Sequence, residues 1–158
     1  MVDGKAAPTG CVATAMAQIM YYFKYPMSGK GKATYTVFDN DNNTSYDIDI
    51  NSTYAWEKMK VRYLRPVDTD DAVATLMRDA GASSKMQYSA QSSGTSDFYA
   101  AKGFGDNFRY DSLAIKRYAR NFYSDEEWME IVSSELEKQR PILYCGQAVS
   151  YTHLRAHE

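Results

Sequence analysis

Apolar residues recur at helical spacing in two stretches of the first half of this chain. Residues 11–23 are rich in Ala and Met and contain no Gly or Pro, and Tyr25-Pro26 follows them. Because proline disfavours a helical residue before it, this pattern predicts a helix that ends before Pro26. Residues 68–80 carry apolar side chains on one face, which predicts a second helix with Gly81 as its C-cap.

Between these helices the pattern changes to that of strands. Residues 34–38 and 45–50 are rich in Tyr, Thr, Val and Ile and flank the polar run 39–43. Asp and Asn favour turns, so the pattern predicts a solvent-exposed β-hairpin. We expect a short helix that carries Trp56 and Met59 to follow it.

The second half of the chain contains a loop of small residues over 91–96, which we expect to lead into a short helix at 97–102. Residues 109–117 are expected to be extended. Ser124 and Glu127 have the spacing of a capping box, and the apolar residues after them recur at helical spacing. This pattern predicts a third long helix.

That helix is expected to end near Gln139, and the apolar run at 141–145 then predicts a buried strand. The sequence contains no internal repeat and no stretch with the composition of a linker. Helices and strands of this number and order predict one α+β domain.

Composition supports a folded protein and excludes several classes. Apolar residues make up 44% of the chain and charged residues 24%, which is typical of a globular domain. The formal net charge of −2 gives no reason to expect a nucleic-acid partner. No apolar run approaches the roughly 20 residues that a membrane-spanning helix needs. Residues 1–5 show no apolar core of a signal peptide.

The two cysteines, Cys11 and Cys145, are too few for a disulfide framework, and we interpret both as free thiols. Cys11 falls in the first turn of the first predicted helix, where unpaired N–H groups and the positive end of the helix dipole favour a thiolate. Gly10 and Ala13 beside it are small enough to admit a substrate backbone. A catalytic nucleophile and a buried structural cysteine are both compatible with this placement.

A longer pattern around Cys11 carries a resemblance to a known family. The run from Gly10 to Ala15, followed by Ala17-Gln18-Ile19-Met20 and Tyr25-Pro26, resembles the nucleophile segment of the streptopain family of papain-like bacterial cysteine peptidases. The resemblance continues through 76–81, 86–88, 92–94, 125–128 and 140–146. It therefore covers nearly all of the chain before its last ten residues.

This resemblance implies an incomplete papain-like fold, in which the chain holds the helical lobe with the nucleophile helix and part of the β-rich lobe. It implies that Cys11 is the nucleophile of an endopeptidase that acts on protein or peptide substrates and needs no metal ion or organic cofactor. It places Ser93, Gly94 and Thr95 beside the substrate cleft; without it, these residues are typical of a surface turn. It also implies a secreted or cell-surface bacterial protein with an inhibitory pro-segment.

Residues 149–158 continue none of these patterns. Their sequence looks like the in-frame translation of a transposase adapter used to prepare sequencing libraries, with a match at all ten residues. We therefore predict a partial papain-like peptidase domain at 1–148 and a non-native tail at 149–158. Both histidines of the chain, His153 and His157, lie in this tail, so we expect neither to be the catalytic base.

The resemblance also implies catalytic groups that residues 1–148 do not supply. In the family the catalytic His follows the strand that 141–145 matches, and a Trp-Gly-rich segment beyond it supports that His. The oxyanion-hole Gln lies upstream of the nucleophile, and Gln18 is not its equivalent. We therefore expect the parent protein to be a peptidase and this chain alone to be inactive. A non-catalytic peptide-binding or adhesion module on the same fold is the alternative.

Overall fold

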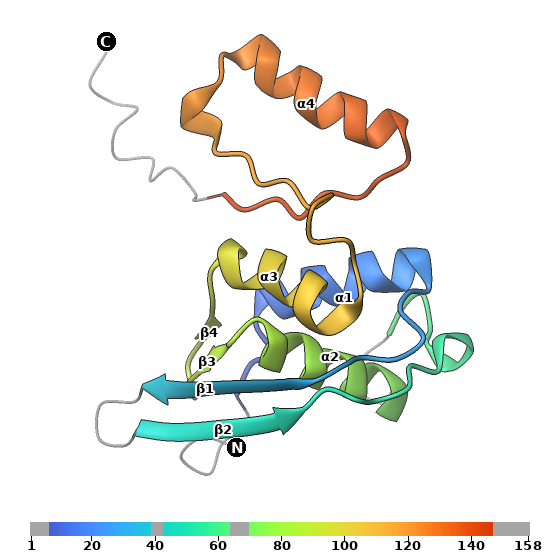
Figure 1. The fold of residues 1–158 in the computed structure, drawn as a ribbon, viewed down its shortest axis with the longest axis vertical. Helices are drawn as coiled ribbons and strands as arrows, with labels where there is room; N and C mark the ends of the chain where they lie inside the picture. Colours follow the sequence, from blue (N-terminus) through green and yellow to red (C-terminus); the bar gives the residue numbers. More distant parts are fainter. Residues whose placement is uncertain (1–6, 39–42, 64–69, 147–158) are drawn as a thin grey trace.

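The structure, a computed structural model, describes residues 7–38, 43–63 and 70–146. Its centre is formed by three helices that contact one another: α1 (Cys11–Phe23), α2 (Asp71–Ser83) and α3 (Asp97–Phe108). Figure 1 shows the hairpin of β1 (Lys32–Phe38) and β2 (Asn43–Asp49) along one side of this group. The apolar side chains that are buried completely are those of Ala13, Met16, Met20, Ile50, Ala80, Met86 and Phe108.

Helix α1 has the bounds that the sequence predicts. Its buried residues recur at the spacing of one helical face, and they are Val12, Ala13, Met16, Ala17 and Met20. The helix ends at Phe23 because Lys24 adopts the left-handed conformation, with a φ of 50°, immediately before Tyr25-Pro26. The buried face fixes how α1 lies on the core and therefore where its first residue is presented.

The β1–β2 hairpin is confirmed, but the expectation that it is solvent-exposed is wrong for one of its faces. Ala33, Tyr35 and Val37 are buried, and β1 contacts α2. Because side chains alternate across a strand, the other face of β1 remains in solvent. Tyr35 lies opposite Tyr46 in the antiparallel register, and their rings stack 5.6 Å apart. Most of the predicted turn at 39–43 lies outside the described residues.

Helix α2 is capped by Asp70, whose carboxylate accepts hydrogen bonds from two backbone N–H groups of the first turn. The first residues of the predicted range, 68 and 69, lie outside the described residues. The prediction of Gly81 as C-cap is wrong, because the helix continues to Ser83. A Cβ on Gly81 would overlap the hydroxyl of Tyr88, so this glycine allows close packing inside the helix rather than ending it.

A buried carboxylate joins α2 to the segment that follows the hairpin. Asp79 is fully buried and accepts a 2.8 Å hydrogen bond from the hydroxyl of Tyr54. The guanidinium of Arg78 donates two more to it, at 2.6 and 2.9 Å. The helix expected around Trp56 and Met59 is reduced to a single 3-10 turn, η1 (Trp56–Lys58), whose Trp56 is buried next to Tyr54.

After α2 the chain forms two short strands, β3 (Gln87–Tyr88) and β4 (Ser93–Gly94), which pair antiparallel. Helix α3 begins where predicted but continues past residue 102 to Phe108. Gly103 lies inside the helix, and a Cβ at this position would lie only 2.9 Å from the hydroxyl oxygen of Ser83 on α2. The glycine therefore brings α2 and α3 close together.

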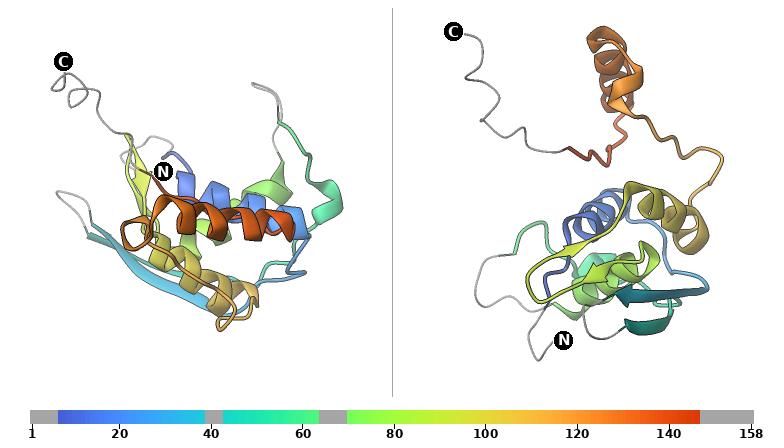
Figure 2. Two further views of the ribbon diagram at one scale, coloured as in Figure 1. Left: turned by 90° about the horizontal axis from the view of Figure 1, so that it is seen from above. Right: turned by 90° about the vertical axis from the view of Figure 1, so that its left-hand side faces the viewer.

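Helix α4 (Asp125–Glu137) confirms the predicted capping box, in which Ser124 and Glu127 each accept a hydrogen bond from the other's backbone N–H. None of its residues is buried, and it stands apart from α1, α2 and α3 in Figure 1 and in the right-hand view of Figure 2. A single 3-10 turn, η2 (Arg120–Phe122), precedes it. None of the described helices is long and apolar enough to cross a membrane.

Two segments around α4 differ from the sequence predictions. Residues 109–117 contain a turn at 112–114 and no strand. The prediction of a buried strand at 141–145 is wrong, since no described strand pairs with it and Tyr144 is 63% exposed. An apolar run becomes a buried strand only where a neighbour satisfies its backbone groups. The predicted tail, with both histidines, lies outside the described residues.

Candidate active site

Cys11 is the first residue of α1, and its side chain is exposed. The N-cap residue, Gly10, has no side chain that could cap the helix, so the N–H groups of the first turn remain open to an anion. The carbonyl of Gly10 accepts hydrogen bonds from the N–H and the hydroxyl of Thr14, at 3.2 and 3.0 Å. An exposed thiol on a fixed helix terminus does not fit the alternative of a buried structural cysteine.

The backbone of Gly10 links this helix terminus to the loop after α2. Its φ of 90° and ψ of 140° lie in a region of backbone conformation that residues other than glycine rarely adopt. A Cβ at this position would lie 2.7 Å from the sulfur and terminal methyl of Met86 and 3.3 Å from the carbonyl oxygen of Ser93. Glycine at position 10 therefore permits the start of α1 to lie close to Ser93 of β4, and Cys11 is the next residue along the chain.

The predicted substrate loop thus lies beside the predicted nucleophile, and its three residues differ in what they can offer. The hydroxyl of Ser93 is buried without a hydrogen-bond partner among the described residues. Gly94 is exposed, and a Cβ built on it would meet nothing within 4 Å. The hydroxyl of Thr95 donates to the carbonyl of Ser84 and so anchors the loop to the end of α2. Gly94 pairs with Gln87 in the β3–β4 ladder, and the face of its backbone that a side chain would cover is open to an approaching chain.

Cys145, to which the sequence analysis gives no role, lies in the electrostatic neighbourhood of this site. Cys145 is exposed like Cys11, but partial burial of its sulfur raises the pKa of the Cys145 thiol above its ordinary value, and negative charge on Asp97 and on Cys11 raises it further. At a given pH, a smaller fraction of Cys145 is therefore in the thiolate form than for an ordinary cysteine. The only signal for it in the sequence is that it is the second cysteine.

The described residues do not include a base for Cys11, since neither histidine of the chain lies among them. The same residues contain no cluster of three or more His, Cys, Asp or Glu side chains arranged to hold a metal ion. What the described part of the site offers is a thiol, the open N–H groups of a helix terminus and a loop with an exposed backbone.

Comparison with known proteins identifies the family of this chain. The family model of the peptidase C10 family matches residues 1–158. The chain belongs to the peptidase C10 family. Among curated proteins it is similar to the thiol protease/hemagglutinin PrtT of Porphyromonas gingivalis, with 32% identity over 96% of this chain and 18% of that protein. It is 30% identical to streptopain of Streptococcus pyogenes over 90% of this chain and 37% of streptopain.

Two solved structures of similar proteins support the fold. The active wild-type interpain A cysteine protease of Prevotella intermedia superposes with a TM-score of 0.74 at 40% identity, over 85% of this chain and 56% of that chain. A prointerpain A fragment gives a TM-score of 0.74 at 36% identity, over 89% of this chain and 46% of its own. The fold is therefore papain-like and of the mixed α+β class, as the sequence predicts. The chain spans 18% and 37% of the length of the two curated relatives.

Proposed function

We propose that the protein to which this chain belongs is a cysteine endopeptidase with Cys11 as its nucleophile. The observation that carries the proposal is the exposed thiol on the uncapped start of α1, next to the open backbone of Gly94, in a member of the peptidase C10 family. A thiolate there would be stabilised by the helix terminus, and an extended peptide could lie along Gly94 within reach of it. Thr95 would hold the loop in place for this contact.

The proposed chemistry is acyl transfer. A base takes the proton of the Cys11 thiol, the thiolate sulfur attacks the scissile carbonyl carbon, and the carbonyl π electrons move to its oxygen. The backbone N–H of Cys11 and a second donor hold this oxyanion. The protonated base gives its proton to the leaving amine as the C–N bond breaks, and water then hydrolyses the thioester to release the acid and the free thiol.

For the 158-residue chain alone we propose little or no turnover. The described residues supply the thiol and the loop but no histidine, and the two histidines at 149–158 fall in the segment that we predict to be adapter-encoded. Loss of a general base costs about 10²- to 10⁴-fold in rate. Hydrolysis of a fluorogenic peptide by this chain at the rate of a complete peptidase would contradict the proposal.

The test of the catalytic role uses the longer protein. We expect Cys11→Ala to abolish hydrolysis of a fluorogenic peptide and to prevent labelling by an epoxide inhibitor of thiol peptidases. Cys145→Ala is the matched control, since it removes the other thiol and is expected to leave both signals in place. Equal turnover by the Cys11→Ala variant and the wild type would overturn the assignment.

A non-catalytic peptide-binding or adhesion module is the second candidate, and the word hemagglutinin in the name of the PrtT relative is the observation that favours it. The residue at the position of the family's histidine in the longer gene distinguishes the two. A histidine there supports the peptidase, and any other residue supports the binding module. As part of the peptidase proposal, we propose that the protein is secreted or exposed on the cell surface and that its precursor carries an inhibitory pro-segment. The similarity to prointerpain A supports the pro-segment.

A further inference from the structure

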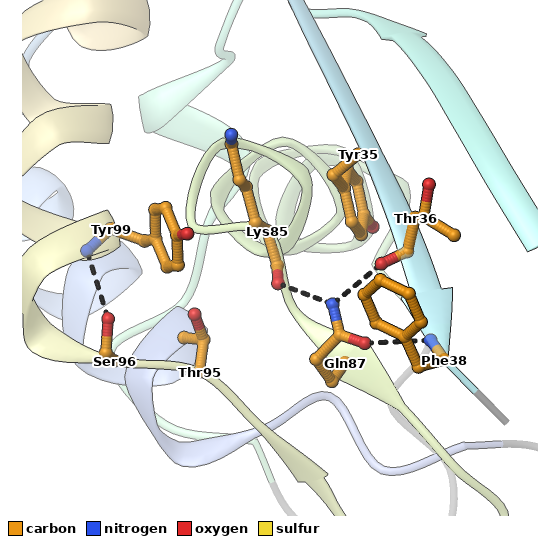
Figure 3. Close-up of a pocket in the computed structure, with 8 residues that line it drawn as sticks. All are labelled: Tyr35, Thr36, Phe38, Lys85, Gln87, Thr95, Ser96 and Tyr99. Carbon is orange, nitrogen blue, oxygen red and sulfur yellow. Dashed lines mark hydrogen bonds between the residues drawn. The ribbon is translucent and has the colours of Figure 1, made fainter.

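A cavity of about 380 Å³ lies beside the loop that borders Cys11, and Cys11 itself does not line it. Figure 3 shows it between β1, the turn after α2 and the start of α3. Its apolar walls are aromatic rings from elements far apart in the sequence, namely Tyr35 and Phe38 of β1 and Tyr99 of α3. Thr95 and Ser96 close it on the side of the substrate loop. No part of the proposed chemistry uses this cavity.

The cavity carries one charge. Lys85 is the only ionisable lining residue apart from the tyrosines, and Figure 3 shows its side chain between the rings of Tyr99 and Tyr35. Its ammonium lies 5.1 Å from the centre of the Tyr99 ring, a cation–π distance. No carboxylate among the described residues forms an ion pair with it. The cation therefore has no acidic partner within the described protein and is free to accept one from a ligand.

The other polar groups of the cavity are mostly engaged within the fold. The side-chain oxygen of Gln87 accepts from the N–H of Phe38 at 3.0 Å, and its amide nitrogen donates to the carbonyls of Thr36 and Lys85 at 3.0 and 3.4 Å. The Thr95 hydroxyl donates to the fold as well. Gln87 therefore ties the hairpin to the turn and acts as a rigid wall.

The groups left to recognise a ligand can all donate a hydrogen bond, and the one that carries a charge is a cation. They are the Lys85 ammonium, the hydroxyl of Tyr99 and the hydroxyl hydrogen of Ser96, whose oxygen already accepts from the N–H of Tyr99. The hydroxyl of Tyr35 has no partner among the described residues either, but it is buried, so a ligand in the cavity would contact the ring of Tyr35 and not its hydroxyl. Donors at one end and flat apolar walls around them suit a carboxylate on a short apolar stem.

The position of the cavity relative to Gly94 indicates what would bring that carboxylate. Thr95 lines the cavity and directly follows the open backbone of Gly94. One residue of extended chain advances about 3.3 Å, so a peptide lying along Gly94 reaches the cavity within one or two residues of that contact. We propose that this cavity is a specificity pocket that takes an acidic side chain, glutamate above all, of a peptide bound beside Cys11. The inference rests on the proposed function in one respect, namely that a peptide binds along Gly94.

The test measures binding and not turnover, so that it is separate from catalysis. Fluorescence anisotropy of this chain is recorded with labelled nonapeptides of Gly, Ala and Ser in which a single Glu is moved through the positions, and with the matched Gln set. We expect one position at which Glu binds about fivefold to tenfold more tightly than Gln at low salt, a ratio that falls as salt rises. Lys85→Met should remove the ratio, and Lys85→Arg should preserve it.

Lys116→Met is the matched control, because it removes an exposed lysine away from the cavity and should leave the Glu/Gln ratio unchanged. Absence of a preference at every position, or a preference that survives Lys85→Met, overturns the pocket. Cys11-dependent turnover in the longer protein together with no preference refutes the pocket alone. A Lys85-dependent preference together with no turnover refutes the peptidase proposal alone. Near-ultraviolet circular dichroism of each variant shows that a lost preference is not lost folding.

Discussion

Substitution of Gly10 by alanine tests how the start of α1 is held against β4. The backbone at Gly10 has a φ of 90° and a ψ of 140°, and forcing a side chain into such a region costs about 1–3 kcal/mol. The new methyl carbon would also lie 2.7 Å from two atoms of Met86, a side chain that is fully buried. Displacing a packed core side chain costs a further roughly 1–3 kcal/mol. Gly10→Ala should therefore lower the free energy of unfolding by about 2–6 kcal/mol.

Urea unfolding followed by tryptophan fluorescence measures this loss, because Trp56 is buried in the same core. Gly94→Ala is the matched control on the other side of Cys11: its φ is not in the left-handed region and its methyl would meet nothing within 4 Å. We expect that control to change the free energy of unfolding by less than about 0.5 kcal/mol. If Gly10→Ala and Gly94→Ala unfold at the same urea concentration as the wild type, the account of Gly10 is wrong.

Two further predictions concern the buried polar groups of the core. Asp79→Ala should destabilise the fold by about 1–3 kcal/mol, since it leaves the buried hydroxyl of Tyr54 without its acceptor while the remaining charge on Arg78 is half exposed. A double-mutant cycle with Tyr54→Phe should give a coupling of at least about 1 kcal/mol, and additive effects in the urea assay would refute the contact. Burial, with a smaller effect of Tyr25, raises the pKa of Tyr110 to about 12, whereas an unfolded tyrosine titrates near pH 10. Between about pH 10 and pH 12, Tyr110 keeps its proton in the folded state and loses it in the unfolded state. The contribution of Tyr110 to the free energy of unfolding is therefore complete below about pH 10 and is lost as the pH rises towards 12. Tyr110→Phe should flatten the fall in melting temperature over that range, and an unchanged slope would contradict the raised pKa.

The elements that the sequence predicts well are those whose signals are local. Helix α1 has the predicted bounds because its apolar face, its lack of Gly and Pro, and the Tyr25-Pro26 stop all agree. The capping box of Ser124 and Glu127 likewise needs only four consecutive residues. The prediction of Gly81 as a C-cap was wrong because glycine is needed there for packing against Tyr88, and no local sequence pattern reveals that contact.

The features that could not be predicted from the sequence depend on packing between residues far apart in the chain. The resemblance suggested Cys11 and the Ser93 loop as parts of one site, but only the structure shows Gly10 against the carbonyl of Ser93. The cavity around Lys85 is assembled from β1, the end of α2 and α3, so its members share no sequence spacing. The apolar run at 141–145 failed as a strand for the same reason, because a strand is decided by its neighbour.

The central claim is that Cys11 is the reactive thiol of this chain, and alkylation with iodoacetamide under native conditions tests it most directly. Mass spectrometry of tryptic peptides separates the rates at Cys11 and Cys145 in one sample. Both thiols are exposed, and we predict that Cys11 reacts several times faster, since it lies at an open helix terminus while partial burial of the sulfur and neighbouring negative charge raise the pKa of Cys145. In denaturant the two rates should become similar. A native Cys11 that reacts no faster than Cys145 would contradict the account.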